Sequence, residues 1–184
     1  FPTRRSSDLH LTEKLRLIGG ARYEKTDMEV VSEDTTQPEG NIETEDILPS
    51  LNIVYSLKEN MNLKAAYGKT LARPSFREIS PLVSYDFKEG DKFVGNTNLE
   101  RTLIHNYDLR FEWFNAPGHL IAVSAFYKYF DQPIEKVIKD INYWQSWVNA
   151  ETGQSYGIEI ELRQQLGLIH KSLRNFSINT NASL

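Results

Sequence analysis

Two stretches of alternating side chains, joined by a short polar connection, constrain this chain more than any other feature. They lie in Ile47–Pro81, which reads ILPSLNIVYSLKENMNLKAAYGKTLARPSFREISP. Their apolar positions are Leu51, Ile53, Tyr55 and Leu57, and then, after Lys58–Met61, Leu63, Ala65, Tyr67 and Leu71. A period of two places one face of a strand against an apolar medium and the other against a wet one. The pattern therefore predicts two antiparallel strands joined by a tight turn.

Five further stretches alternate in the same way, so we predict seven strands in all. The additional strands are expected at residues 11–29, 107–113, 120–130, 155–163 and 176–184. Their connections alternate in length. Short turns are expected at 58–61, 115–118 and 167–172, and long polar loops at 30–46, 73–102 and 131–150. Short turns on one rim and long loops on the other are typical of outer-membrane barrels.

Strand length and charge favour the same architecture. Strands of about 9 to 11 residues cross a bilayer when tilted, whereas strands of soluble proteins usually have about 5 to 6. One face of the predicted strands carries charges, which are Asp108, Arg110, Glu112, Glu159, Glu161 and Arg163. We predict an all-β fold, an antiparallel up-and-down transmembrane β-barrel segment, with a polar lumen. The lipid face of the first hairpin is assigned to Leu51, Ile53, Tyr55, Leu63, Ala65 and Tyr67. A soluble β-sandwich that buries the same residues is the alternative.

Composition excludes several other classes. The longest aliphatic run, residues 120–123, is far shorter than the roughly 20 residues of a spanning helix. The formal net charge of −4 is small and its signs are interspersed, so we expect no nucleic-acid partner. The chain has no cysteine, which removes thiolate metal sites and cysteine nucleophiles. No nucleophile motif and no phosphate-binding loop is found, so we predict that it is not an enzyme.

The first residues differ from the rest. Phe1–Leu9 shows no alternation and resembles translated adapter sequence, so we expect it to be a non-native head and count no strand before Leu11. It also lacks the apolar stretch of a signal peptide. The remaining residues, 10–184, are expected to form one partial barrel domain.

Several blocks of the sequence resemble the barrel of TonB-dependent outer-membrane receptors, in the order that this family shows. The most specific is TLARPSF at Thr70–Phe76, followed by Pro81. The others are GNTNLE at 95–100, NYDLRFEWF at 106–114, VSAFYKYFDQPIE at 123–135 and YGIEIELRQQL at 156–166. The resemblance implies a barrel of about 22 strands, of which this chain would be an internal piece from the C-terminal half. The plug, the TonB-contacting segment and the last strands would lie outside it.

The resemblance also implies a function and a place in the cell. Such receptors lie in the bacterial outer membrane, among its lipids, and take up a scarce nutrient with energy passed through the TonB complex. The ligand would be a small molecule or an oligosaccharide: siderophore-bound iron, cobalamin, haem or a glycan. Two other functions stay open from the sequence, a soluble β-sandwich module that binds glycans and a passive porin.

Candidate ligand contacts lie in the two longest predicted loops. Ligand sites favour aromatic surfaces with a few polar groups, and arginine pairs with anions. The candidates are Arg73, Arg77, Tyr85, Phe87, Tyr143, Trp144 and Trp147. Membrane-interface anchoring is an alternative role for the loop tryptophans and tyrosines, and a structural role is an alternative for Arg73 beside Pro74.

We predict no cofactor and no metal site. The four histidines lack the convergent spacing of metal ligands and are expected to be solvated residues at strand ends. They are His10, His105, His119 and His170. The acidic loop at 33–46 matches no ordered calcium-binding pattern and is expected to be a solvated loop.

Overall fold

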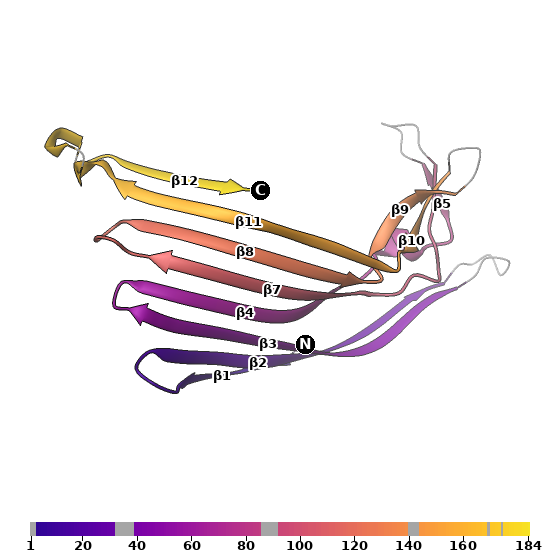
Figure 1. Ribbon diagram of the computed structural model, residues 1–184. Helices are drawn as coiled ribbons and strands as arrows, with labels where there is room; N and C mark the ends of the chain where they lie inside the picture. The colour runs from indigo at the N-terminus through magenta and orange to yellow at the C-terminus, as the bar shows by residue number, and fades with distance from the viewer. Residues whose placement is uncertain (1–2, 32–38, 86–91, 140–143, 169, 174) are drawn as a thin grey trace.

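The structure is a computed structural model of the whole chain, dominated by one large antiparallel sheet (Figure 1). It describes residues 3–31, 39–85, 92–139, 144–168, 170–173 and 175–184. Within this part of the chain, no helix has the length and apolar character needed to cross a membrane.

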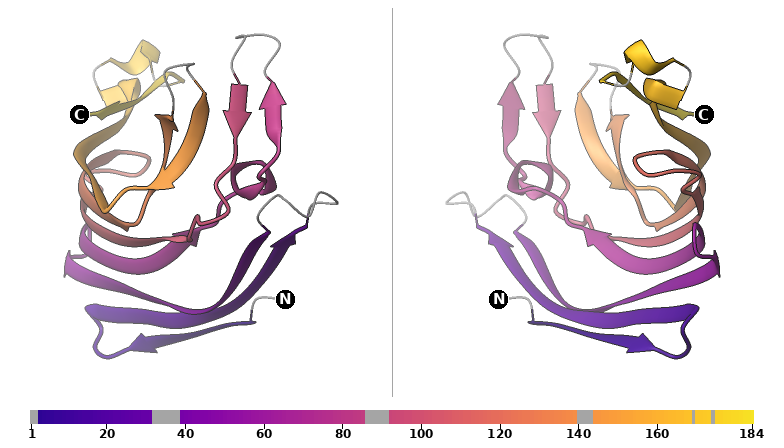
Figure 2. Two further views of the ribbon diagram at one scale, coloured as in Figure 1. Left: turned by 90° about the vertical axis from the view of Figure 1, so that its right-hand side faces the viewer. Right: turned by 90° about the vertical axis from the view of Figure 1, so that its left-hand side faces the viewer.

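Eight strands form the large sheet, in the spatial order β1-β2-β3-β4-β7-β8-β11-β12. Their bounds are β1 (Thr3–His10), β2 (Leu15–Val30), β3 (Gly40–Lys58), β4 (Met61–Ala72), β7 (Thr102–Trp113), β8 (Leu120–Asp131), β11 (Thr152–Gln165) and β12 (Ser177–Ser183). Each strand lies beside its predecessor in the sheet, so the arrangement is up-and-down. Seen along the strands, the sheet curves into an open trough whose two edges do not meet (Figure 2). The predicted all-β antiparallel barrel segment is confirmed.

The head of the chain carries an eighth strand that the sequence did not predict. β1 pairs with β2 from Thr3↔Tyr23 to His10↔Arg16. The prediction was wrong here because backbone pairing at a sheet edge needs no alternation of side chains. The turn at 11–14, which was expected to lie in a strand, is closed by the hydroxyl of Thr12, which accepts a hydrogen bond from the N–H of Leu15 at 3.0 Å.

The connections alternate in length as predicted. Short turns join β1 to β2, β3 to β4 and β7 to β8 at one end, and a short segment with two 3₁₀ turns, η1 (Leu166–Leu168) and η2 (Lys171–Leu173), joins β11 to β12. The long connections lie at the other end (Figure 1). The loop expected at 30–46 is corrected: Gly40–Asp46 belongs to β3, and Val30 pairs with Gly40. Buried Ile42 and Asp46 alternate with exposed glutamates there, so the strand continues with a charged outer face.

A second, smaller sheet forms within the two longest connections, where the sequence predicted loops only. Its order is β5 (Val83–Tyr85), β6 (Lys92–Val94), β10 (Gln145–Asn149) and β9 (Ile134–Ile138). β6 pairs with β10 in parallel at Phe93↔Gln145 and so joins the two connections. The short helix α1 (Phe76–Ile79) precedes β5. We call these elements, with the extended tips of β2 and β3, the loop body.

The core of the described structure lies in the loop body. Ile42 from β3, Ile79 from α1 and Leu99 before β7 are buried together. Met28, Val30, Ile134 and Trp147 pack against them. Three segments that are far apart in the sequence therefore share one core, which holds the long connections in place over the end of the large sheet.

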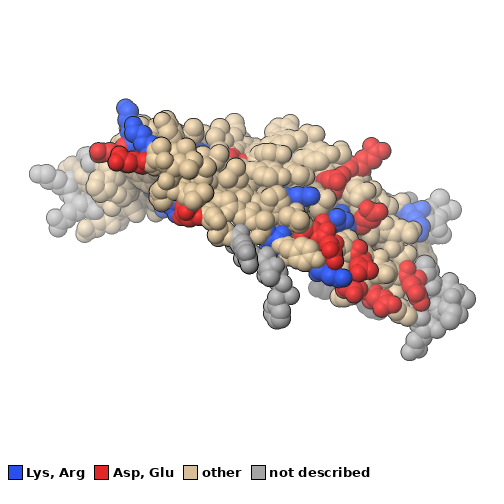
Figure 3. Space-filling view, turned by 90° about the horizontal axis from the view of Figure 1, so that it is seen from below, with Lys and Arg blue, Asp and Glu red and all other residues tan. Residues whose placement is uncertain are grey.

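The two faces of the large sheet differ in chemistry. On the convex face, Leu51, Tyr67, Tyr107, Tyr127 and Tyr156 form one row across five strands, and Ile53, Ala65, Leu109, Ala125 and Ile158 form the next. This face is uncovered: Leu109 is 50% exposed and Ile158 is 51% exposed. Seen from the β1 side, the surface is largely uncharged over its middle, and charged side chains lie toward its two ends, with most of the acidic ones at the long-connection end (Figure 3). A soluble sandwich would bury such a face against a second sheet.

The concave face carries a network of ion pairs. Arg110 contacts Glu112 at 2.9 Å and Glu161 at 2.6 Å. Lys64 also contacts Glu112, at 2.7 Å, and Arg163 contacts Glu161, at 2.6 Å. Glu112 is buried, and partly buried charges require such partners. The charged positions thus share one face, as the alternation predicted.

Candidate functional site

The exit from β4 fixes the start of the longest connection. Arg73 donates a hydrogen bond to the hydroxyl of Thr26 at 2.5 Å and forms an ion pair with Glu24, so it binds this connection to β2. Pro74 is fully buried. The carboxylate of Glu78 accepts a hydrogen bond from the N–H of Ser75 at 2.7 Å, which caps α1. The TLARPSF block therefore has a structural role, and the guanidinium of Arg73 is already paired with Glu24 and Thr26.

The block GNTNLE locks α1 against the rest of the connection. A Cβ on Gly95 would lie 2.1 Å from the carbonyl oxygen of Ser80, so only glycine fits here. The N–H of Asn96 donates to the carbonyl of Glu78 at 2.7 Å, and the side-chain amide of Asn96 donates to the carbonyl of Trp147 at 2.9 Å. One residue thus joins the two longest connections.

A second amide clamps the other side of the same block. The side chain of Asn149 accepts a hydrogen bond from the N–H of Glu100 at 2.9 Å and donates to the carbonyl of Glu100 at 3.0 Å. It also donates to the carbonyl of Gln132 at 2.9 Å. Arg101 contacts the buried carboxylate of Asp46 at 2.8 Å and ties the block to β3. The loop body is consequently pre-organised before any ligand is bound.

Basic and aromatic side chains meet on the small sheet. The ring of Phe93 is buried; the guanidinium of Arg77 lies 4.5 Å from its centroid and the ammonium of Lys136 lies 4.4 Å from it. Trp147 stacks with Phe93 at 5.7 Å between ring centroids. Lys92 lies 5.6 Å from the ring centroid of Trp144. We call these six residues the cationic–aromatic cluster.

The cluster concentrates positive charge on the small sheet. Arg77, Lys92 and Lys136 are exposed, and none of the ion pairs among the described residues includes them. The face of an aromatic ring attracts a cation electrostatically and so helps to fix its position. The arrangement presents three positive charges and two indole rings from a rigid support.

The predicted ligand contacts divide into three groups. Arg77, Trp144 and Trp147 lie in the cluster. Arg73 does not, because it is bound to β2, and Tyr85 lies beside the cluster as the register partner of Lys92. Phe87 and Tyr143 lie outside the described residues.

Sequence reasoning missed Lys92 and Lys136 as members of the site. Little signal was present: the lysines lie in two short stretches, KFV and IEKVI, whose polar and apolar residues do not alternate. Such three- to five-residue stretches are hard to distinguish from loop by pattern alone.

The histidines differ from one another in their surroundings. His119 is buried, at 3% exposure, so the expectation of a solvated residue was wrong for it. His105 accepts or donates a hydrogen bond at Nδ1 with the hydroxyl of Tyr67 at 3.0 Å. Among the residues that the structure describes, no group of three or more histidines and carboxylates could hold a metal ion.

Comparisons with known proteins agree with this architecture. The family described as "TonB dependent receptor-like, beta-barrel" matches residues 6–183, a match that begins inside the head. No curated protein matches. Among solved structures, the siderophore receptor PirA from Pseudomonas aeruginosa has a TM-score of 0.69 at 18% identity, covering 88% of this chain and 30% of PirA.

Two other solved receptors are similar. The ferric enterobactin receptor PfeA from Pseudomonas aeruginosa has a TM-score of 0.66 at 19% identity, with 90% of this chain and 24% of PfeA covered. The hemophore receptor HasR from Serratia marcescens has a TM-score of 0.64 at 15% identity, with 82% of this chain and 29% of HasR covered. The chain thus spans 24% to 30% of these receptors' length, and the likeness at this identity is one of fold.

Proposed function

The chain belongs to the TonB-dependent receptor-like β-barrel family, and from this membership we propose that it is part of the wall of an outer-membrane receptor that takes up a scarce nutrient with TonB-derived energy. The observation that carries the proposal is the curved sheet with two unlike faces. Its convex face is apolar and uncovered, and its concave face holds the network around Arg110. A barrel wall between lipid and a polar lumen needs this arrangement.

The height of the apolar band supports a membrane crossing. On the convex face of β2, every second residue from Leu15 to Tyr23 is apolar or small, over a strand segment of nine residues, and Lys25 and Asp27 follow on that face. Nine residues agree with the length of a tilted spanning strand, about 9 to 11 residues. The short turns then lie on the periplasmic side and the loop body on the extracellular side, by the usual asymmetry of these barrels.

The cationic–aromatic cluster favours an anionic ligand with a planar part. Arg77 and Lys136 supply charge, and Trp144 and Trp147 supply flat apolar surface. Within the ligand classes that the family resemblance implies, this chemistry suits siderophore-bound iron or haem better than cobalamin or a neutral oligosaccharide. The similar solved receptors are described as binding such ligands, ferric enterobactin for PfeA and heme with its hemophore for HasR.

The test is uptake by the complete receptor. Cells that lack other iron receptors would express it and receive radioactive iron as catecholate, hydroxamate or haem complexes, each with and without TonB. We expect uptake of at least one anionic complex, lost when TonB is removed. Uptake that is equal without TonB indicates a passive porin instead. Release of the receptor from membranes by a carbonate wash contradicts the membrane barrel itself.

A further inference from the structure

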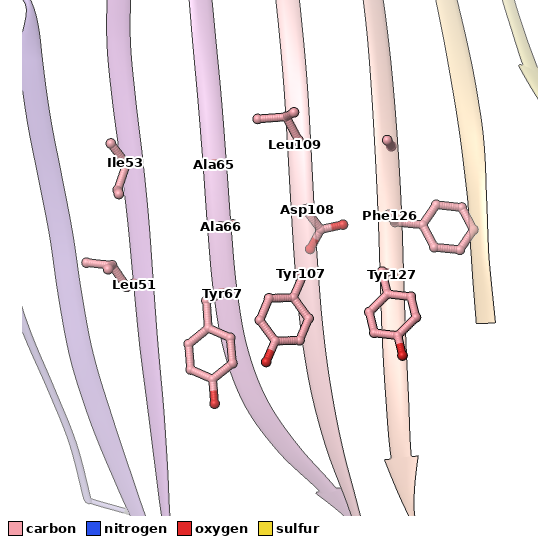
Figure 4. Close-up of a pocket in the computed structure, with 11 residues that line it drawn as sticks. Leu51, Ile53, Ala65, Ala66, Tyr67, Tyr107, Asp108, Leu109, Phe126 and Tyr127 are labelled. Atoms are coloured by element: carbon pink, nitrogen blue, oxygen red, sulfur yellow. The ribbon is translucent and has the colours of Figure 1, made fainter. Parts of the chain in front are cut away.

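The convex face of the sheet is not flat. A groove of about 450 Å³ lies over β3, β4, β7 and β8 (Figure 4). Small side chains form its floor, Ala65 and Ala125, and they alternate across the strands with Ile53 and Leu109. The groove is therefore an apolar depression on the outer surface of the sheet. It lies in the part of the sheet that the proposed function places in the bilayer.

Tyrosines close the groove at its extracellular end. Tyr67, Tyr107 and Tyr127 are direct neighbours across three strands, with ring centroids 5.1 and 6.1 Å apart. Their hydroxyls all point toward the long-connection end, away from the alanine floor (Figure 4). Hydroxyl groups at the edge of an apolar surface mark the level at which the bilayer becomes polar.

A cation lies just beyond this row. Lys69 follows Tyr67 by two positions, so its side chain leaves the same face, and its register partner is His105. No ion pair of the described residues includes Lys69. Lys25 on the same face, in contrast, contacts Glu43 at 3.2 Å and Glu45 at 3.7 Å. Asp131 is the acidic residue nearest in register, two positions beyond Tyr129, the partner of His105.

We propose that the groove and Lys69 together bind one phosphate-bearing lipid of the outer leaflet. An acyl chain fills the groove over Ala65, and the phosphate lies at Lys69. The tyrosine hydroxyls and His105 offer further hydrogen bonds at the same level. Lysine binds phosphate as a compact point charge. The inference rests on the proposed function, because only an inserted barrel presents this face to lipid.

A second copy of the chain is a poorer occupant. If two barrels packed through this groove by two-fold symmetry, both Lys69 side chains would lie at the same level of the membrane. Their positive charges would repel each other, and no described acidic residue pairs with Lys69 to offset this. A cation, Lys69, lies beyond one end of the groove, and the groove lining is apolar apart from the tyrosine hydroxyls and Asp108. A single anionic lipid, with a phosphate at one end and an apolar chain, matches this distribution.

Lipid retention by the complete receptor tests the proposal. Receptor in nanodiscs of phosphatidylcholine with a small fraction of lipid A would be released into a mass spectrometer under native conditions. We expect the wild type to retain one lipid A, and Lys69→Gln to retain it about fivefold less, equivalent to about 1 kcal/mol for one surface cation. Ala65→Phe, which fills the groove, should reduce retention similarly.

Two matched variants serve as controls. Lys25→Gln removes a cation from the same face, where glutamates already neutralise it, and Val123→Phe adds the same ring to the same face outside the groove. Both should retain lipid A like the wild type. Equal retention by Lys69→Gln and the wild type overturns the proposal, as does equal retention of dephosphorylated lipid A or a dimeric mass without lipid.

Insertion is measured separately, by the shift in gel mobility that folded outer-membrane barrels show before heating. If a variant shifts normally and takes up its nutrient but retains as much lipid as the wild type, the lipid site is refuted and the proposed function stands. If the wild-type receptor never inserts into the membrane, both the proposed function and the lipid site are refuted. If Ala65→Phe fails to insert, Lys69→Gln still decides the question.

Discussion

At the scale of single residues, Gly95 is the position with the least freedom. We expect Gly95→Ala to displace α1, because its Cβ would overlap the carbonyl oxygen of Ser80. Overpacking of this kind costs about 1 to 3 kcal/mol, and the strain falls on the loop body. Ligand affinity of the complete receptor should fall by about tenfold, measured by fluorescence titration. Gly68→Ala is the control, since no atom lies within 4 Å of a Cβ there, and an equal loss in both variants contradicts the assignment.

The cationic–aromatic cluster makes a prediction at the same scale. Arg77→Ala and Lys136→Ala should each weaken binding of an anionic ligand about three- to tenfold, because each removes a cation held over Phe93. The dissociation constant and its dependence on salt are the measurements. Lys139→Ala changes the charge of the same connection without touching a described ring and should leave affinity unchanged. A loss as large in Lys139→Ala would assign the effect to overall charge.

The sequence predicted part of this site for a physical reason. Arg77 and Trp147 were candidates because their residue types suit ligands, and type is visible in a sequence. Arg73 shared the type but is bound to Glu24, a partner 49 positions away. Lys136 gains its place only because β9 pairs with β10 and puts it opposite Trp147. Non-local pairing of this kind leaves no mark on the local pattern.

At the scale of elements, the tips of β2 and β3 pair with each other and also pack into the core of the loop body. Ile42→Ala should loosen the shared core with Ile79 and Leu99, at a cost of about 2 to 5 kcal/mol for a buried aliphatic truncation. Hydrogen exchange is expected to accelerate in α1 and in the tips of β2 and β3 while β7 and β8 stay protected.

Val31→Ala provides the comparison for that experiment. Val31 follows β2 directly and is 61% exposed, so its truncation should leave exchange unchanged. Uniform acceleration across β7 and β8 in Ile42→Ala would mean that the loop body and the wall unfold as one unit, contrary to the separate core described here.

Elements were predictable where one face meets an apolar medium. β4, β7 and β8 have 12 residues each, and their convex face is apolar at every second position from the short turns to the tyrosine row, because a side that faces an apolar medium must remain apolar there. β1 and the tip of β3 were not predicted, because their outer faces are polar and their pairing depends on backbone hydrogen bonds, which leave no apolar alternation in the sequence. β5, β6, β9 and β10 have at most five residues, too few to establish a period.

At the scale of the whole molecule, the large sheet ends in two edge strands, each of which is paired on one side only. β1 and β12 each have one neighbour, and every described position of β12 is exposed. A closed barrel has no such edges, and open edges pair with other chains. The curvature seen in Figure 2 therefore needs further strands of the receptor to become a closed wall.

Refolding tests this dependence directly. The 184-residue chain alone, diluted from denaturant into detergent micelles, should form oligomers or aggregates and show no heat-dependent gel shift. Its edges pair between copies, and the network around Arg110 faces water instead of an enclosed lumen. The complete receptor, refolded in the same way, should give one monodisperse species with the shift. A monomeric, protease-resistant and heat-modifiable product from the chain alone would mean that these eight strands close on themselves, a geometry unlike the open trough.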